Sequence, residues 1–215
     1  KNEVKNVRGF VELRILIDKL IAEAETQTKA QIVLAAVKRS DSYSEIPWKA
    51  FAFGVSICGF TIFLLGMFLL RWITDTMILF SVASILVTGA IFVLMTLLFP
   101  RFARLFLSES RKESETLQYA ESLFLSRELF ATEGRRGILL LVSQFERQVV
   151  ILPDIGVIDC LSNEVMKNII SKMTQHLRKK EIRKAMETGL EELVSELCPS
   201  ALSRPDKNEL SNEII

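Results

Sequence analysis

Three polar residues stand where an α/β protein could bind a ligand. Ser40 and Asp41 follow directly after an apolar stretch at residues 31–37, and Arg147 comes shortly after a second apolar stretch at residues 137–143. If the two stretches form parallel strands, their carboxyl ends share one edge of a sheet, and open α/β sheets bind ligands at that edge. The sequence therefore predicts a polar ligand site made by these three side chains. The alternative is that they belong to ordinary solvated turns.

Carboxylates offer a different chemistry, because calcium and other hard cations require oxygen ligands. Asp154 and Asp159 lie close together in the sequence, after an apolar stretch at residues 148–152. Together they predict a weak metal site. The alternative is structural, with Asp154 capping the turn at residues 153–156.

The chain offers few residues that could support histidine-based or nucleophilic catalysis. His176 is the one histidine, it lies among lysines and arginines, and we expect it on the surface. No spacing supports a triad of Ser40, His176 and Asp41, so no catalytic residue is assigned. The three cysteines are too far apart for a zinc ribbon or a thioredoxin motif. Their odd number fits a reducing compartment better than a disulfide framework.

The candidate residues need a sheet to position them. Residues 31–37 and 137–143 are almost continuously apolar, which is typical of strands covered on both faces. A short polar turn leads to an expected antiparallel third strand at residues 148–152. Three- and four-residue spacing of apolar side chains predicts helices at residues 10–24, 113–130, 163–177 (with Ser162 as N-cap) and 181–197. The element order predicts an α/β fold, a three-layer αβα sandwich with a small mixed sheet.

Two stretches without any charged residue interrupt this soluble pattern. Ala50–Leu70 and Thr76–Pro100 are each on the order of 20 to 25 residues long, enough for a helix to cross about 30 Å of hydrocarbon. Because only residues 71–75 separate them, the sequence predicts a two-helix transmembrane hairpin inserted into the α/β domain. The alternative is a buried helix pair in a soluble protein, which rarely shows two such consecutive stretches.

The predicted domain organisation follows from this insertion. The parts are the first portion of the α/β domain at residues 1–48, the hairpin at 49–100 (spans at about 50–70 and 76–99), the second portion at 101–198 and a tail at 199–215. Residues 101–107 are amphipathic, and we expect them to lie along the membrane surface. The first residue is Lys1 rather than Met, which fits a start that is missing or processed. Residues 10–24 mix charged with apolar side chains, unlike a secretory signal.

Flanking charge sets the expected orientation. Basic residues lie on both sides of the hairpin, whereas the short turn has Arg71 beside Asp75. The positive-inside rule therefore places the soluble domain and both termini in the cytoplasm, as in a multi-pass protein of the cell inner membrane. The expected membrane-interface residues are Trp48, Trp72, Arg101 and Arg104.

The two spans predict an anchor rather than a transport path. Neither contains an ionisable residue, so no ion or proton route is expected through them. A pore or transporter subunit is the alternative and would require oligomers. Small residues, among them Gly54, Gly59, Gly66 and Gly89, permit close contact between the helices. The net charge of +1 argues against a nucleic-acid partner.

Several soluble segments carry a family resemblance. The most specific is Thr132–Ser143, which continues through Glu146–Val157, and weaker ones are Ala22–Val33, Cys198–Pro199 and Asp206–Leu210. Together they resemble the TPM domain, a family that includes thylakoid-lumen, photosystem-repair and receptor-modulator proteins. The resemblance implies a Rossmann-like αβα sandwich, attached to membranes in many members.

The same resemblance bears on chemistry. Weak acid phosphatase activity, calcium binding and help with the assembly or repair of membrane complexes are associated with the family. Many members carry an acidic Gly-Asp-type loop between the last two helices, whereas this chain has the basic segment Arg178–Lys184 there. A basic segment repels calcium, so calcium binding at this loop is disfavoured and no cofactor is expected.

The insertion point of the hairpin bears on which ligands can reach the carboxyl end of the sheet. The hairpin leaves the carboxyl end of the first strand, so that end of the sheet should face the bilayer, together with Lys38, Arg39, Arg101, Arg104 and Arg147. These cations would contact anionic headgroups or a partner membrane protein, and a soluble substrate would have poor access. The leading hypothesis is a non-enzymatic, membrane-anchored TPM-domain protein that binds or maintains a membrane component. Its expected partners are the lipid bilayer and a membrane protein or further copies of itself; the alternative function is a weak phosphatase or a divalent-cation site.

Overall fold

The computed structural model describes residues 17–68, 75–132 and 134–197. The chain divides into two compact units, one made of Lys1–Asp41 with Lys112–Ile215 and the other of Ser42–Arg111. The second unit includes residues on both sides of the charge-free stretches, because its first helix begins before them and the segment after them folds back. The expected hairpin turn with Trp72, the beginning of the first helix and the C-terminal tail lie outside the described residues.

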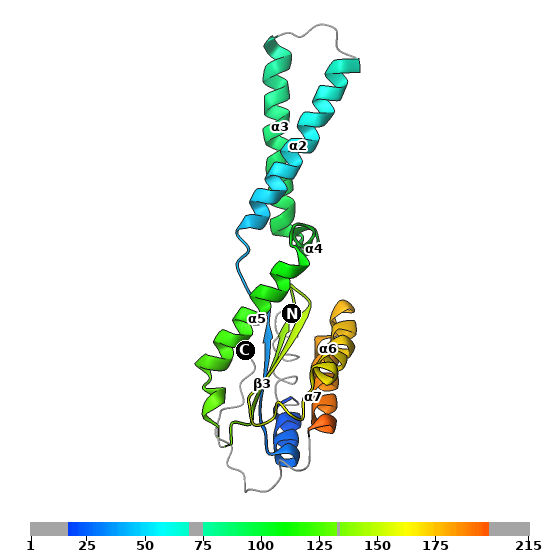
Figure 1. Ribbon diagram of the computed structural model, residues 1–215. Coiled ribbons are helices and arrows are strands. Elements are labelled where there is room, and N and C mark those ends of the chain that lie inside the picture. Colours follow the sequence, from blue (N-terminus) through cyan, green and yellow to red (C-terminus); the bar gives the residue numbers. More distant parts are fainter. Residues whose placement is uncertain (1–16, 69–74, 133, 198–215) are drawn as a thin grey trace, which may run out of the picture. The chain divides into compact units, whose positions relative to one another are not determined.

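The first unit is built on one sheet whose strands come from both sides of the hairpin. Its strands are β1 (Gln31–Val37), β2 (Gly137–Ser143) and β3 (Gln148–Pro153), in the order β1-β2-β3. β1 pairs with β2 in parallel, with Gln31 opposite Gly137 and Val37 opposite Ser143, and β2 pairs with β3 in antiparallel. The predicted mixed sheet is therefore confirmed, and Figure 1 shows β1 joining the strands of the later segment.

Helices cover both faces of this sheet, which explains why its strands are continuously apolar. Ile32 and Leu34 point to a core shared with the helical residues 17–28 and with α6 (Asn163–Arg178) and α7 (Ile182–Glu196). Val33 and Ala35 point to the opposite face, where α5 (Glu109–Ser126) packs. Figure 1 shows α5 on one side of the strands and α6 with α7 on the other.

Local sequence signals predict some helix ends correctly and others incorrectly. Ser162 caps α6 as expected, because its Oγ accepts a hydrogen bond from the backbone N–H of Val165 at 3.3 Å. The helix expected at residues 113–130 is instead α5 followed by a short 3-10 turn at Leu129–Ala131. The break occurs at Glu128, whose φ of 52° is incompatible with a continuing right-handed helix.

The second unit is the helical hairpin of α2 (Glu45–Phe68) and α3 (Asp75–Leu98). Two glycines set how closely these helices pack. A Cβ at Gly89 would lie 2.6 Å from a ring carbon of Phe51, and one at Gly54 would lie 3.0 Å from the ring of Phe92. Gly59 and Gly66 have no such neighbour within 4 Å.

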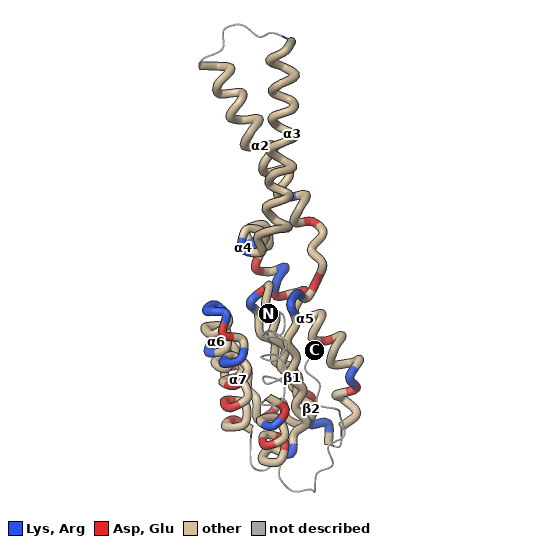
Figure 2. Tube along the Cα trace, turned by 180° about the vertical axis from the view of Figure 1, so that it is seen from behind, with Lys and Arg blue, Asp and Glu red and all other residues tan. Residues whose placement is uncertain are grey.

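Most of the hairpin surface is apolar and exposed. Both helices are long and apolar enough to cross a membrane, and only 6% of each one's most apolar stretch is buried within the protein. A core helix of a soluble protein would be mostly buried, so this exposure argues against that alternative. Figure 2 shows α2 and α3 almost without charge along their length.

The segment after α3 folds back onto the base of the hairpin. It consists of α4 (Pro100–Ala103) and a 3-10 turn, Arg104–Phe106. The Phe102 ring lies edge-on to Phe92, with centroids 5.7 Å apart, and the Phe106 ring lies 5.8 Å from Phe53. Leu105 is 77% exposed beside these rings, so the segment presents apolar surface outward.

Candidate functional site

The carboxyl ends of β1 and β2 meet at a compact edge. Beyond the strands, Gln144 N–H donates to the Val37 carbonyl at 3.0 Å, and Phe145 N–H donates to the Lys38 carbonyl at 3.1 Å. The turn after β2 is thereby bound to the residues that follow β1. This edge is the one where the sequence predicts a ligand site.

Glu146 is the central polar group at this edge. It is 3% exposed, and its carboxylate accepts one hydrogen bond from the Ser143 hydroxyl and another from the backbone N–H of Ser40 at 2.9 Å. A carboxylate removed from water needs such donors to offset the loss of hydration. The bonds thus hold Glu146 in place while joining segments on either side of the hairpin.

A third segment reaches the same place through Thr116 of α5. The Ser40 hydroxyl donates to Thr116 Oγ1 at 3.4 Å, and the Thr116 hydroxyl donates to the Lys112 carbonyl at 2.7 Å. Thr116 and Ser143 are both fully buried. The end of β1, the start of α5 and the β2–β3 turn therefore converge on a buried network of hydroxyls around one carboxylate.

The structure places the predicted ligand residues around this network in different ways. Ser40 belongs to it, and Asp41 follows half-exposed. Arg147 comes directly after Glu146, half-exposed, with a left-handed φ of 57°. Sequence reasoning did not include Glu146 in the site, because a glutamate within a polar turn looks solvated. Ligand binding by Ser40, Asp41 and Arg147 stays a prediction.

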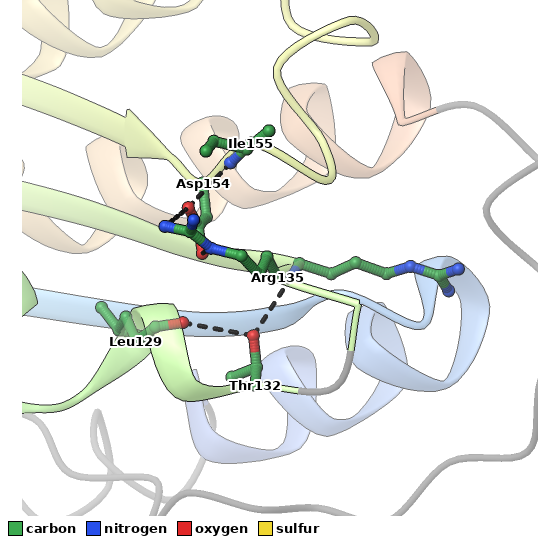
Figure 3. Close-up of polar contacts among 6 residues, drawn as sticks. Leu129, Thr132, Arg135, Asp154 and Ile155 are labelled. Carbon is green, nitrogen blue, oxygen red and sulfur yellow. Dashed lines mark hydrogen bonds and ion pairs between the residues drawn. The ribbon is translucent and has the colours of Figure 1, made fainter.

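The opposite edge of the sheet carries an ion pair between Arg135 and Asp154. The guanidinium binds the carboxylate through two bonds, Nε to Oδ2 at 3.2 Å and Nη2 to Oδ1 at 3.0 Å (Figure 3). The Asp154 side chain is 4% exposed, whereas that of Arg135 is 52% exposed. Ile155 N–H also donates to Asp154 Oδ1, at 2.8 Å. The carboxylate therefore serves as a cap of its turn and as an anchor for Arg135.

Backbone contacts fix the two loops that bring this pair together. Gly156 N–H donates to the Arg135 carbonyl at 2.9 Å, and a Cβ at Gly156 would collide with the carbonyl oxygen of Gly134. On the other side, Arg136 N–H donates to Thr132 Oγ1 at 3.1 Å. Arg135 itself has a φ of 53°, a turn conformation that these contacts stabilise.

This geometry bears on the metal hypothesis. Asp154 already binds a guanidinium, and Asp159 is exposed. Within the described ranges, no group of three or more histidine, cysteine, aspartate or glutamate side chains is arranged to hold a metal ion. The contacts of Asp154 fit the capping alternative, and a metal site at Asp154 and Asp159 stays a prediction.

His176 and Glu181 form a polar pair at the junction of α6 and α7. His176 Nδ1 lies 3.2 Å from Glu181 Oε2, and Lys184 Nζ donates to Glu181 Oε1 at 3.2 Å. These contacts, the one with His176 first, lower the pKa of the Glu181 carboxyl below its ordinary value of 4.5. Both side chains are partly exposed, His176 at 30% and Glu181 at 36%, so the pair lies at the surface of the domain.

Comparison with known proteins identifies the domain to which these elements belong. Residues 103–196 match the model of the TPM domain family. The match contains α5, β2, β3, α6 and α7, and the segment with β1 precedes it. No curated protein and no solved structure matches the chain. The chain thus carries a TPM domain, as the resemblance of its Thr132–Val157 region predicted.

Proposed function

We propose that this chain is a membrane-anchored TPM-domain protein that binds or helps to maintain another membrane component without catalysing a reaction. The observation that carries the proposal is the parallel pairing of β1 with β2. Both membrane-length helices lie between these strands in the sequence. A soluble unit folded around such an insertion stays attached to the membrane through two chain connections.

The composition of the hairpin supports an anchoring role. Neither helix contains an aspartate, glutamate, lysine, arginine or histidine between Ala50 and Phe68 or between Thr76 and Leu98, which argues against a charged path for ions or protons. Trp48 is exposed near the start of α2, and Arg101 is exposed after α3, as expected at a membrane–water interface. The positive-inside rule favours an inner-membrane protein with the TPM domain and both termini in the cytoplasm.

Chain connectivity supports an interaction role over an enzymatic one. Helices on both faces of a small mixed sheet support a Rossmann-like sandwich, and open α/β sheets bind ligands at the carboxyl ends of their strands. Here residues 38–44 link that end of β1 directly to α2. An edge so close to an anchor favours a partner that is itself in the membrane, either another protein or a second copy of the chain.

A test must separate this role from a weak phosphatase. The full chain, extracted in mild detergent, is incubated with a general phosphate ester, alongside Asp41→Ala and Asp154→Ala variants. We expect retention in membranes after an alkaline wash and no turnover that depends on either aspartate. Recovery of the chain without detergent, or turnover that both substitutions abolish, would overturn the proposal. Co-purification from native membranes then identifies the partner.

A further inference from the structure

The junction between α6 and α7 carries a concentrated positive charge. Arg178, Lys179 and Lys180, called the α6–α7 basic turn below, are all exposed and form no ion pair with any residue that the structure describes. The nearby carboxylate of Glu181 is engaged by His176 and Lys184 instead. Three neighbouring cations are therefore available to an external anion.

Helix capping does not explain this charge. The carbonyl of His176 accepts hydrogen bonds from the backbone N–H groups of Lys179 and Glu181, both at 3.0 Å, and the Leu177 carbonyl accepts one from Lys180. The last turn of α6 already contains His176 and Arg178, which complement the helix dipole. Lys179 and Lys180 add charge that neither the dipole nor the carbonyl groups require.

The basic turn lies at a defined end of the TPM domain. β3 runs antiparallel to β2, and α6 packs against β3 while running back along it. Figure 1 shows the α6–α7 junction at the same end of this unit as the β2–β3 turn. Figure 2 shows blue residues at that end of α6, whereas red residues mark the far part of α7. The two ends of this helix pair thus differ in charge.

Both connections to the hairpin leave from this same end. Ser40 lies just before the first connection, Thr116 lies just after the second, and their hydroxyls are 3.4 Å apart. Exposed Lys38 and half-exposed Arg147 lie at this end as well. Cations therefore lie at the end where the chain departs for its apolar helices, together with half-exposed Asp41 and exposed Glu113.

We propose that the α6–α7 basic turn binds the anionic headgroups of the membrane that the hairpin enters. This inference rests on the proposed membrane anchoring, since without an anchored hairpin there is no adjacent lipid surface. Lysine and arginine within a Debye length, about 8 Å at physiological salt, are attracted to anionic lipid. Each such residue contributes on the order of fivefold in affinity. The turn would act as a second attachment that fixes how the TPM domain faces the bilayer.

The test uses the full chain in lipid nanodiscs. One set contains phosphatidylcholine alone, and the other contains phosphatidylcholine mixed with phosphatidylglycerol. Amide hydrogen exchange is followed in peptides that cover residues 176–184 and in peptides from both hairpin helices. We expect slower exchange at residues 176–184 in the anionic discs only, and loss of this protection at high salt. The hairpin peptides are expected to be protected in both lipids.

Two matched double variants make the result specific. Arg178→Gln with Lys179→Gln removes two charges from the basic turn, and Lys19→Gln with Lys167→Gln removes two exposed charges elsewhere in the domain. We expect the first pair to abolish most of the lipid-dependent protection and the second pair to preserve it. Two results would overturn the headgroup contact but leave the anchor intact. One is an equal loss of lipid-dependent protection in both double variants. The other is no effect of anionic lipid on residues 176–184 while the hairpin peptides stay protected. Rapid exchange of the hairpin peptides in both lipids overturns the anchor and this inference together.

Discussion

The backbone N–H of Ser40 donates a 2.9 Å hydrogen bond to Oε1 of Glu146, although the whole hairpin lies between these residues in the sequence. The bond joins the last residues before the insertion to the turn after β2. Because Glu146 is buried, this contact and the bond from the Ser143 hydroxyl hold a polar side chain inside the domain. The two segments of the first unit are therefore joined by polar contacts as well as by strand pairing.

Removing the Glu146 carboxylate is predicted to destabilise the domain. Glu146→Ala leaves the Ser40 N–H and the Ser143 hydroxyl without their acceptor, at a cost of about 1–3 kcal/mol for each buried group left unpaired. Chemical unfolding of the detergent-solubilised chain measures this loss. Gln144→Ala is the control, because that side chain lies in the same turn and is exposed. Equal stabilities of the two variants would contradict the structural role of Glu146.

The Arg135–Asp154 pair predicts that two substitutions of Asp154 lower the stability of the domain by different amounts. Asp154→Asn keeps an oxygen for the Ile155 N–H but loses the charge, so we expect a loss of about 1 kcal/mol, since Arg135 is half-exposed and solvent screens the pair. Asp154→Ala also loses the cap, and about 2 kcal/mol is expected. Unfolding midpoints of both variants check this order.

The same variants test the metal hypothesis. If Asp154 is engaged only by protein groups, calcium should leave the unfolding midpoint of the wild-type chain unchanged. A calcium-dependent rise that Asp154→Asn removes would instead assign the carboxylate to a cation, because a ligand that binds the folded state stabilises it.

Helix packing in the hairpin gives a prediction with an internal control. Gly89→Ala places a methyl group against Phe51 and is expected to cost about 1–3 kcal/mol through overpacking. Gly59→Ala adds the same group where nothing lies within 4 Å. Thermal unfolding in detergent should rank Gly89→Ala below the wild type, with Gly59→Ala close to it. The reverse ranking would be incompatible with the α2–α3 contact.

The lowered pKa of Glu181 predicts a pH-dependent contribution to stability. A carboxyl whose pKa is lower in the folded than in the unfolded state stabilises the fold above its ordinary value of 4.5, and this contribution disappears as the pH falls through the lower folded value. Glu181→Gln should therefore lower the unfolding midpoint at neutral pH, and the difference from wild type should vanish in acid. Glu191→Gln, at an exposed position of α7, is the control. A difference that persists in strong acid would exclude the ionic contacts with His176 and Lys184 as its cause.

How far the sequence predicts this structure depends on the kind of contact. The bounds of β1 and β2 follow from their apolar runs, and their pairing follows because both strands are buried on each face. The burial of Glu146 does not follow, since its donors come from residues distant in sequence or from a turn that looks solvated. The Arg135–Asp154 pair also escapes prediction, because only the folded sheet brings the two loops together. The local sequence pattern thus predicts the sheet, whereas the side-chain partners of Glu146 and Asp154 can be identified only from the structure.

We propose that the hairpin crosses the membrane while interrupting one folded domain. Side-specific labelling tests it most directly, in a chain whose Cys58, Cys160 and Cys198 are replaced. A single cysteine is introduced at Thr74, between α2 and α3 in the sequence, or at Glu191, an exposed position of α7. A membrane-impermeant maleimide should reach the cysteine at position 74 only from outside and the cysteine at position 191 only from the cytoplasmic side. Labelling of both positions from the same side would show that the helices do not span the bilayer.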